Sequence, residues 1–358
     1  LGQLKEAEFS TRKAIELNPD IAITNSNLGI IFSNLDQLEE AKFWTRKAIE
    51  LDPNQAETHS NLGNIFRDLS KLKEAELSYR KAIELNSDFV EAHINLACVL
   101  LKSKNFKAGW EEYEWRLKNK KYNSRFILKT NKPKWFPNKR GRVLLLKEQG
   151  LGDQILFLSL IPDLIDKVDK IIIFIDQRLI TLLKRSLDNS IELISKESSL
   201  DEKDYDYQLP LGSLMQYLRP TLKHFENSRR FNLLCNKEKT KLLRARLINN
   251  KYKKIVGISW KTKSNTFHTS NISLEQLILA IYNPEIIFVS LQYGNIKEEI
   301  NNIKLKYGIK ILEVDGLDIF NDIDNLATLI SACDEVVTIE NVNQVLAGSL
   351  GIKTKVLL

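Results

Sequence analysis

KAIEL stands at residues 13–17, 47–51 and 81–85, and this pentapeptide decides the fold of the first third of the chain. Its alanines, Ala14, Ala48 and Ala82, are equally spaced, and neighbouring positions repeat with the same period. These neighbours are Asn27-Leu28-Gly29, Asn61-Leu62-Gly63 and Asn95-Leu96-Ala97, together with the small residues Ala7, Ala41, Ala75 and Gly109. Small side chains at fixed positions let helices approach closely, so the pattern predicts repeated pairs of helices.

Prolines mark the ends of the predicted helix pairs. Pro19 and Pro53 each follow a helical segment, and Ser87 takes that place in the third copy. A 34-residue period with these features resembles the tetratricopeptide repeat, and the resemblance covers residues 1–118. Stacked repeats of this kind form a superhelix with a concave groove. We therefore expect the repeats to bind a protein or glycan acceptor in that groove.

The histidines and cysteines do not predict a metal site. His59 and His93 are separated by the same period, which makes them equivalent positions of the repeat rather than a pair of ligands. Cys98, Cys235 and Cys333 lie far apart and form no CxxC pair, so we expect reduced, packed thiols. The sequence thus predicts neither a metal nor a cofactor.

The composition, with 43% hydrophobic and 28% charged residues, is that of a folded protein. No apolar run approaches the roughly 20 residues that cross a bilayer, so we expect a cytoplasmic protein without a transmembrane segment. The chain opens with Leu1 inside a helical pattern, which indicates a piece of a longer protein.

The net charge of +7 is concentrated in one strip. Residues 116–142 hold eleven Lys and Arg and no acidic residue, with Pro133 and Pro137 among them. Such a strip can bind nucleic acid, but no helix-turn-helix, zinc finger or aromatic RNA-binding motif accompanies it. We interpret residues 119–141 as a solvated basic linker and expect no nucleic-acid partner.

Beyond the strip the hydrophobic pattern changes to short runs between helical segments. The runs read as buried strands, and they are RVLLLK (142–147), KIIIFID (170–176), KKIVGIS (253–259), EIIFVSL (285–291), IKILEVD (309–315), EVVTIE (335–340) and KTKVLL (353–358). Alternation of strands and helices predicts parallel, doubly wound sheets. A lysine-rich helical stretch near 236–252 separates two groups of strands. We therefore predict two α/β lobes, at residues 142–240 and 250–358, with a cleft between them.

Ligands of such sheets bind beyond the carboxyl ends of strands, and the first candidate there is Gly150-Leu151-Gly152-Asp153. Ile155 stands where a dinucleotide fingerprint needs its third glycine, and no GK[ST] follows. Asp153 can cap the next helix or act in catalysis. The motif alone leaves both roles open.

The second candidate is TIENVNQVLAGSLGIK (338–353). We expect a strand to end near Ile339 and a short helix to run from about Val342 to Leu350, with Gly351 at its C-terminus. Ala347 and Gly348 are small enough to bring this helix close to its neighbours. Free amides at its start are suited to a diphosphate.

Read together, four segments resemble a known family. PKWFPNKRGRVLLLKEQGLGDQILF (133–157), VGISWKTKS (256–264), FVSLQYG (288–294) and NDIDNLATLISACDEVVTIEN…LAGSLG (321–351) occur in this order. They are similar to bacterial tetratricopeptide-repeat proteins whose C-terminal half looks like a heptosyltransferase of glycosyltransferase family 9. The resemblance implies the glycosyltransferase B-type fold, with two Rossmann-like lobes. The C-terminal lobe would be truncated here, without its last helices.

The resemblance also implies roles for individual residues. Asp153 would be the general base on the acceptor hydroxyl, in an acceptor loop with Gly150, Gly152 and Gln154. The donor nucleotide sugar would be approached by the strand end Ser259-Trp260-Lys261, and by Glu340, Asn341, Asn343 and Gly348. Lys261 would neutralise diphosphate charge, although an ordinary exposed lysine fits the sequence equally well.

The chain departs from the family at the donor loop. The family usually has Asp or a small polar residue, then a hydroxyl residue, then a histidine four residues later; here these positions hold Glu340, Asn341 and Val345. His268 could replace the missing histidine or be a bystander in its loop. The departure keeps a second interpretation open, in which the α/β half is a degenerate remnant.

The leading hypothesis is an inverting, metal-independent hexosyl- or heptosyltransferase. It would move a sugar from a nucleotide-activated donor to an acceptor hydroxyl, with Asp153 as base. Asp204-Tyr205-Asp206 has the spacing of a metal-binding Asp-x-Asp motif, but we interpret it as a loop before Leu209. The alternative is a non-catalytic repeat adaptor that binds a protein partner.

Overall fold

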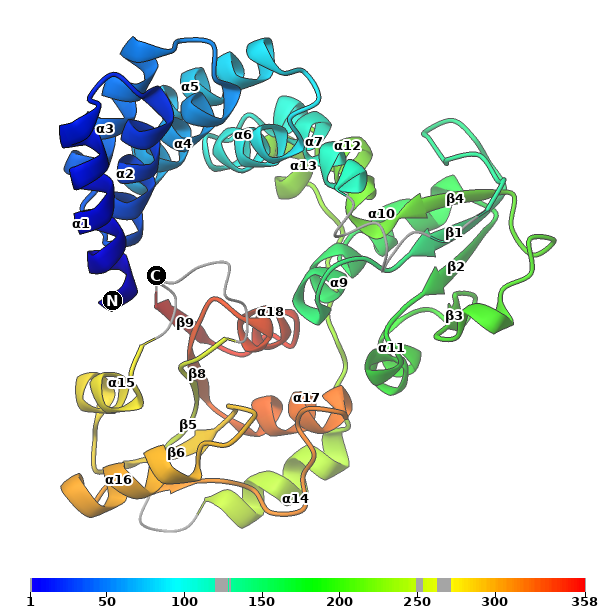
Figure 1. Cartoon of the computed structure of the whole chain (residues 1–358). Helices are drawn as coiled ribbons and strands as arrows, with labels where there is room; N and C mark the ends of the chain where they lie inside the picture. The colour runs from blue at the N-terminus through cyan, green and yellow to red at the C-terminus, as the bar shows by residue number, and fades with distance from the viewer. Residues whose placement is uncertain (1, 120–127, 129, 249–253, 263–271, 358) are drawn as a thin grey trace. The chain divides into compact units, whose positions relative to one another are not determined.

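The computed structural model describes residues 2–119, 128, 130–248, 254–262 and 272–357 (Figure 1). The chain forms two compact units. The repeat unit comprises residues 1–127 and 215–227, and the α/β unit comprises residues 128–214 and 228–358. The predicted donor-loop substitute His268 lies outside the described residues.

The repeat unit is a run of antiparallel helix pairs, as the 34-residue period predicted. Its helices are α1 (Gly2–Leu17), α2 (Ala22–Asn34), α3 (Leu38–Leu51), α4 (Ala56–Asp68), α5 (Leu72–Leu85), α6 (Val90–Lys102), α7 (Phe106–Tyr113) and the 3-10 helix η1 (Glu114–Lys118). At Gly63 an added β-carbon would lie 2.6 Å from the Tyr79 ring, so glycine is required where α4 meets α5. The small residues that repeat with the period therefore lie where helices are in close contact.

The end of the repeat unit includes a segment from much later in the chain. Helices α12 (Leu214–Leu218) and α13 (Leu222–Glu226) follow a strand of the α/β unit. The indole N–H of Trp110 donates to the carbonyl of Arg219 at 2.9 Å, and the rings of Phe106 and Phe225 lie 4.7 Å apart. The sequence division at residue 118 missed this segment, because nothing in residues 215–227 repeats the 34-residue pattern.

The first sheet of the α/β unit has four parallel strands in the order β3-β2-β1-β4. They are β1 (Arg142–Leu146), β2 (Lys170–Phe174), β3 (Glu192–Ile194) and β4 (Tyr207–Pro210). The helices of this part are α9 (Leu151–Leu158), α10 (Ile161–Leu164), α11 (Ile180–Ser186) and the 3-10 helices η2 (Ile165–Lys167), η3 (Gln177–Leu179), η4 (Glu197–Ser199) and η5 (Leu211–Ser213). The prediction included β1 and β2 but not β3 or β4, which are short.

The second sheet has five parallel strands in the order β7-β6-β5-β8-β9. They are β5 (Lys254–Ser259), β6 (Ile286–Ser290), β7 (Ile311–Leu312), β8 (Glu335–Ile339) and β9 (Thr354–Leu357), and all five were predicted. The helices are α14 (Lys237–Leu247), α15 (Leu274–Ile281), α16 (Lys297–Tyr307), α17 (Ile323–Ala332) and α18 (Val342–Ser349). Side chains of α15 and α16 form one core cluster with β5, β6 and β8.

The second half of the predicted linker is anchored to the first sheet by one buried side chain, although most of its residues are exposed. Trp135 is fully buried, and its backbone N–H donates to the carbonyl of Gln208 in β4 at 3.0 Å. Lys134 forms an isolated parallel bridge with the same strand residue. A tryptophan buries a large apolar surface when it packs, which explains why this stretch joins the first sheet despite its basic composition.

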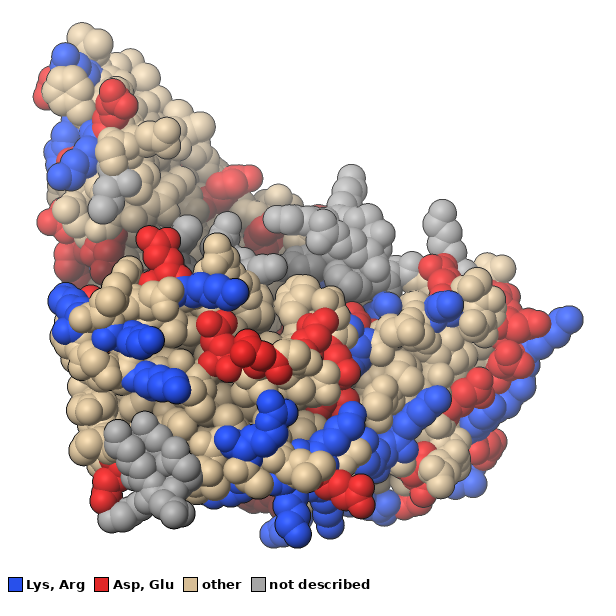
Figure 2. All heavy atoms as spheres, turned by 90° about the horizontal axis from the view of Figure 1, so that it is seen from below, with Lys and Arg blue, Asp and Glu red and all other residues tan. Residues whose placement is uncertain are grey.

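Charges of both signs share the surface. Lys and Arg are interspersed with Asp and Glu over the face shown in Figure 2. Among the described residues, no helix is long and apolar enough to cross a membrane. Nor does the described part of the chain bring three or more His, Cys, Asp or Glu side chains into a group that could hold a metal ion.

Candidate functional site

Each sheet has one switch point, where the strand order reverses, and ligands of doubly wound sheets bind there. In the first sheet it lies between β1 and β4, and in the second between β5 and β8. The two sequence motifs fall on these places, because α9 follows β1 and α18 follows β8. The strand order therefore selects the same segments as the sequence did.

At the first switch point Asp153 occupies the third position of α9, and Gly150 is the residue that precedes the helix. The N–H of Gly150 donates to the Asp153 carboxylate at 3.1 Å. Asp153 thus belongs to the helix start, but as the partner of the cap residue rather than as the cap itself. Burial raises the pKa of Asp153, the hydrogen bond from Gly150 opposes this, and the negative charge of Glu148 adds to the rise.

At the second switch point a neutral network joins the ends of β5 and β8. The hydroxyl groups of Ser259 and Thr338 lie 2.6 Å apart. The side-chain amide of Asn341 donates to Ser259 Oγ at 2.9 Å, and its oxygen accepts from the backbone N–H of Asn343 at 2.9 Å. Asn341 therefore caps α18, and its side-chain atoms serve the fold.

The starts of α9 and α18 lie against each other. A β-carbon built on Gly152 would lie 3.7 Å from the Cα of Val342 and 3.8 Å from a methyl group of Val345. The residue in the family's histidine position therefore contacts the glycine turn through an apolar side chain. This arrangement brings the acceptor loop and the donor loop of the prediction into one place.

Asn343 is the most unusual polar residue of the donor loop. Its side chain is almost fully buried, with 1% of its surface exposed, and its Nδ2 donates to the carbonyl of Leu291 at 3.4 Å. Its Oδ1 is buried and has no hydrogen-bond partner among the described residues. A buried acceptor without a donor is costly, so Asn343 is a candidate to accept a hydrogen bond from a ligand.

Three predicted donor contacts are placed differently from the expectation. Trp260 is fully buried, and its indole N–H donates to Glu299 at 3.0 Å, so its side chain belongs to the core. The ammonium of Lys261 lies 2.5 Å from the same glutamate, which already neutralises it. Gly348 is exposed and an added β-carbon would meet nothing within 4 Å, so it does not permit close packing.

The remaining predicted residues divide between fold and surface. Gln154 is buried and its Oε1 accepts the backbone N–H of Asp176 at 3.1 Å, so it ties α9 to the end of β2. Gly150 and Glu340 are exposed. Glu340 immediately precedes the cap of α18, where its charge suits the helix dipole but repels a diphosphate.

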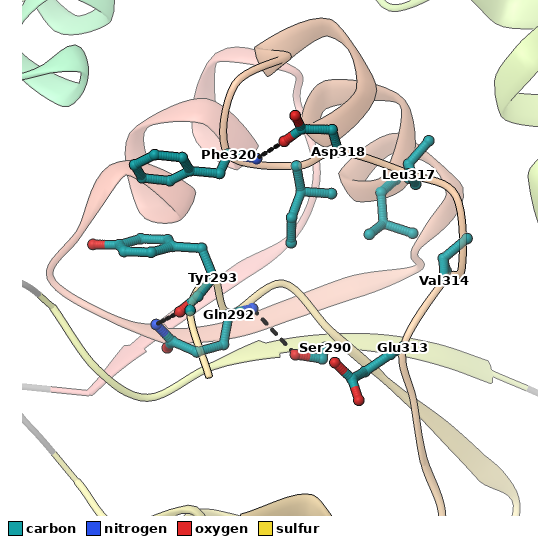
Figure 3. A pocket seen from close by; sticks show the side chains of 11 residues that line it. Ser290, Gln292, Tyr293, Glu313, Val314, Leu317, Asp318 and Phe320 are labelled. Atoms are coloured by element: carbon teal, nitrogen blue, oxygen red, sulfur yellow. Dashed lines mark hydrogen bonds between the residues drawn. The ribbon is translucent and has the colours of Figure 1, made fainter. Parts of the chain in front are cut away.

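A cavity of about 240 Å³ lies beyond β6 and β7, and the sequence did not predict it (Figure 3). The rings of Tyr293 and Phe320 lie close together at one side, with centroids 5.3 Å apart, and Ser290 and Glu313 lie nearer the strands. The volume is somewhat below the roughly 300–1,000 Å³ of small-molecule sites. The full lining is Ser290, Gln292, Tyr293, Gly294, Glu313, Val314, Leu317, Asp318, Ile319, Phe320 and Leu329.

Hydrogen bonds connect the cavity to the end of β5, and a cation–π contact connects it to the loop after β2. The side-chain oxygen of Gln292 accepts the backbone N–H groups of Trp260 and Lys261 at 3.0 and 2.9 Å. The guanidinium of Arg178 pairs with Asp176 and lies 5.8 Å from the centre of the Phe320 ring. In the sequence, the only sign of this cavity was an aromatic residue shortly after a predicted strand. The loops after β6 and β7 meet at the cavity because of the strand order.

In the repeat unit, the fourth residue of α2, α4 and α6 is hydrogen-bonded to the turn that precedes its helix. Its side chain donates to the carbonyl of the residue six positions earlier, at 2.9–3.1 Å. The pairs are Asn25 with Pro19, His59 with Pro53, and His93 with Ser87. The two histidines are thus equivalent structural residues, as the spacing indicated.

Two comparisons with known sequences agree on the repeats. Residues 24–55 and 56–89 match family models of the tetratricopeptide repeat. The curated protein FlbA of Caulobacter vibrioides is 27% identical over 274 residues, which is 71% of this chain and 46% of FlbA. The chain therefore spans about half the length of this relative. The match is longer than the repeats, so it includes part of the α/β unit.

Two solved structures that resemble the chain each cover about a third of it. The crystal structure of MamA has 22% identity and a TM-score of 0.32, over 34% of this chain and 70% of MamA. Pseudomonas aeruginosa PilF has 24% identity and a TM-score of 0.32, over 34% of this chain and 55% of PilF. The chain carries tetratricopeptide repeats, which indicate a protein partner, followed by an α/β region with parallel sheets.

Proposed function

We propose that the α/β unit is a glycosyltransferase of the B-type fold that transfers a sugar from a nucleotide-activated donor to an acceptor hydroxyl. The observation that carries this proposal is the contact between two helix starts at two switch points. One of them bears a carboxylate with a raised pKa, Asp153, and the other is a helix N-terminus suited to an anion. The sequence resemblance supports the same reaction.

The reaction assigns a separate task to each switch point. As the acceptor oxygen bonds to the anomeric carbon, the bond from that carbon to the diphosphate oxygen breaks. Asp153 takes the proton of the acceptor hydroxyl, and the diphosphate leaves with the electron pair. A raised pKa suits Asp153 to this role, because a base works best when its pKa lies near the working pH. The amides at the start of α18 would stabilise the diphosphate.

The cavity beyond β6 and β7 would hold the nucleoside. Tyr293 and Phe320 offer ring faces to a base, and Glu313 offers acceptors for ribose hydroxyl groups. The repeats would bind the protein that carries the acceptor.

Nucleotide binding tests this proposal directly. We expect the purified chain to bind at least one nucleoside diphosphate in a calorimetric panel, and Phe320→Ala to weaken that binding about tenfold through lost ring contact. Phe136→Ala removes a similarly exposed ring of the same unit and serves as the control. If no nucleotide of the panel binds, or if both variants bind alike, the nucleoside site is wrong.

A second candidate is a non-catalytic adaptor, in which only the repeats act by binding a protein. The exposed carboxylate of Glu340 beside the start of α18, and the pairing of Lys261 with Glu299, both disfavour a diphosphate there. An adaptor requires no nucleotide affinity. The same calorimetric panel therefore separates the two candidates.

A further inference from the structure

Glu148 is a buried carboxylate that the proposed reaction does not yet use. It stands two residues beyond β1, and only 5% of its surface is exposed. Its Oε1 accepts the backbone N–H of Gly212 at 2.5 Å. Gly212 lies in η5, directly after β4, so this hydrogen bond spans the first switch point. Buried carboxylates are rare unless they are paired or bound by donors, so its position calls for an explanation.

We propose that Glu148 is a positioning residue for Asp153, which fixes the glycine turn against the end of β4 and places a second carboxylate near the reacting one. This inference rests on the proposed function, because it gives Asp153 the role of the base. It adds a second carboxylate that touches neither substrate.

The backbone supports the positioning part of this role. Glu148 and Asp153 stand at the two ends of one turn. Inside it Gln149 adopts a left-handed conformation with φ of 57°, which is uncommon for a residue other than glycine. The bond from Gly212 holds the first end of the turn, and the bond from Gly150 to Asp153 holds the second. The two bonds therefore hold both ends of the turn at which Asp153 stands.

The charges around α9 support the electrostatic part. The elements packed against α9 include α18 and η5, and their residues, VNQVLAGS and LGS, contain no titratable side chain. Glu340, just before α18, is exposed to solvent, which weakens its influence. Glu148, in contrast, is buried, and its charge raises the pKa of Asp153 in addition to burial. A like charge in a poorly hydrated place favours the protonated form of its neighbour.

The test is a double-mutant cycle of wild type, Glu148→Gln, Asp153→Asn and the double variant, with melting temperatures measured across pH. Because the folded pKa of Asp153 is raised, its ionisation costs stability as pH rises above the ordinary range of aspartate. Asp153→Asn should therefore raise the melting temperature at neutral pH relative to its effect in acid. We expect this pH-dependent gain to be smaller in the Glu148→Gln background. Equal gains in both backgrounds overturn the inference, whether or not the protein transfers a sugar.

Transfer assays add the second readout. With any donor that supports transfer, Glu148→Gln should move the acid limb of the pH–rate profile to lower pH, and an unmoved limb overturns the inference. Glutamine still accepts the Gly212 N–H, so the turn is retained. If the glutamine variant folds poorly, Glu148→Met takes its place in the assay. Methionine removes both the charge and the acceptor, and the variant should show the same shift of the acid limb. Glu197→Gln, at an exposed glutamate of the same sheet region, should leave the profile unchanged. Absence of transfer with every donor, together with unequal stability gains, contradicts the proposed function alone.

Discussion

The two switch points of the α/β unit are built from different chemistry. Between β1 and β4 the connection is a buried carboxylate, Glu148, bonded to a backbone amide, and a second carboxylate stands at the other end of the same turn. Between β5 and β8 the connection is neutral, made by the hydroxyl groups of Ser259 and Thr338 and the amide of Asn341. The first edge therefore carries two carboxylates, whereas neutral side chains join the second edge and Glu340 stands exposed beside it.

Under the proposed function the two edges would have different tasks. A base must exchange a proton near neutral pH, which favours like charges and burial around it. An anion site must instead present oriented amides, and a fixed carboxylate beside them would weaken it. In agreement with this division, the network that caps α18 contains no charged side chain among the described residues. Glu340 is the exception next to it, and it is exposed.

The strongest way to break the comparison is Asp153→Asn. Asparagine still accepts the N–H of Gly150 but cannot take a proton, so we expect transfer to fall at least about a hundredfold. Because the pKa of Asp153 is raised, its loss should not lower stability at neutral pH. Transfer rates and melting temperatures of the same preparation measure both effects. Full activity in this variant, with Asp169→Asn as an exposed control, would leave Asp153 with a structural role only.

Asn341→Ala tests the neutral edge. It removes the cap of α18 and the bond to Ser259, and losing a cap of this kind costs about 1 kcal/mol of unfolding free energy. Asn236→Ala is matched to it, since Asn236 caps α14, a helix outside the site. We expect similar losses in urea unfolding for both variants. Only Asn341→Ala should also weaken nucleotide binding, and equal binding in the two would separate α18 from the donor site.

The smallest effect is expected for Gly348→Ala, which tests whether α18 needs a glycine near its end. An added β-carbon at Gly348 meets nothing, so Gly348→Ala should fit without movement. Alanine favours the helix by roughly 0.5–1 kcal/mol over glycine in a helix interior, and urea unfolding should show a gain of this size. Unchanged nucleotide binding is expected beside it. A loss of stability would show that the backbone around Gly348 needs the glycine for another reason.

Local patterns predicted much of this structure. The KAIEL period gave the helix pairs, the hydrophobic runs gave all of β5 to β9, and Gly351 marked the end of α18 with φ of 73°. These features are set by neighbours in sequence. The strand β4 escaped prediction because YQLP is short and ends in a proline, which usually opposes a strand.

What the sequence could not give depends on contacts between distant residues. The bond from Gly212 to Glu148 joins residues 64 positions apart, and the cavity needs the loops after β6 and β7 to meet. The family resemblance placed Trp260 in the donor segment, yet its side chain is buried in the core cluster that includes residues of α15 and α16. Residue type and spacing therefore located the two sheet edges. The contacts between distant residues, which decide which side chains are buried there, required the structure.

The contact between Trp110 and Arg219 has a consequence for the order in which the protein is made. The two residues are 109 positions apart in the chain. A ribosome adds on the order of ten amino acids per second, so the last repeat helix waits roughly ten seconds for α13. The strands of the first sheet emerge in between. During that interval Phe106 and Trp110 lack their contacts with Phe225 and Arg219. The repeats of a growing chain are complete only after β4 has been translated.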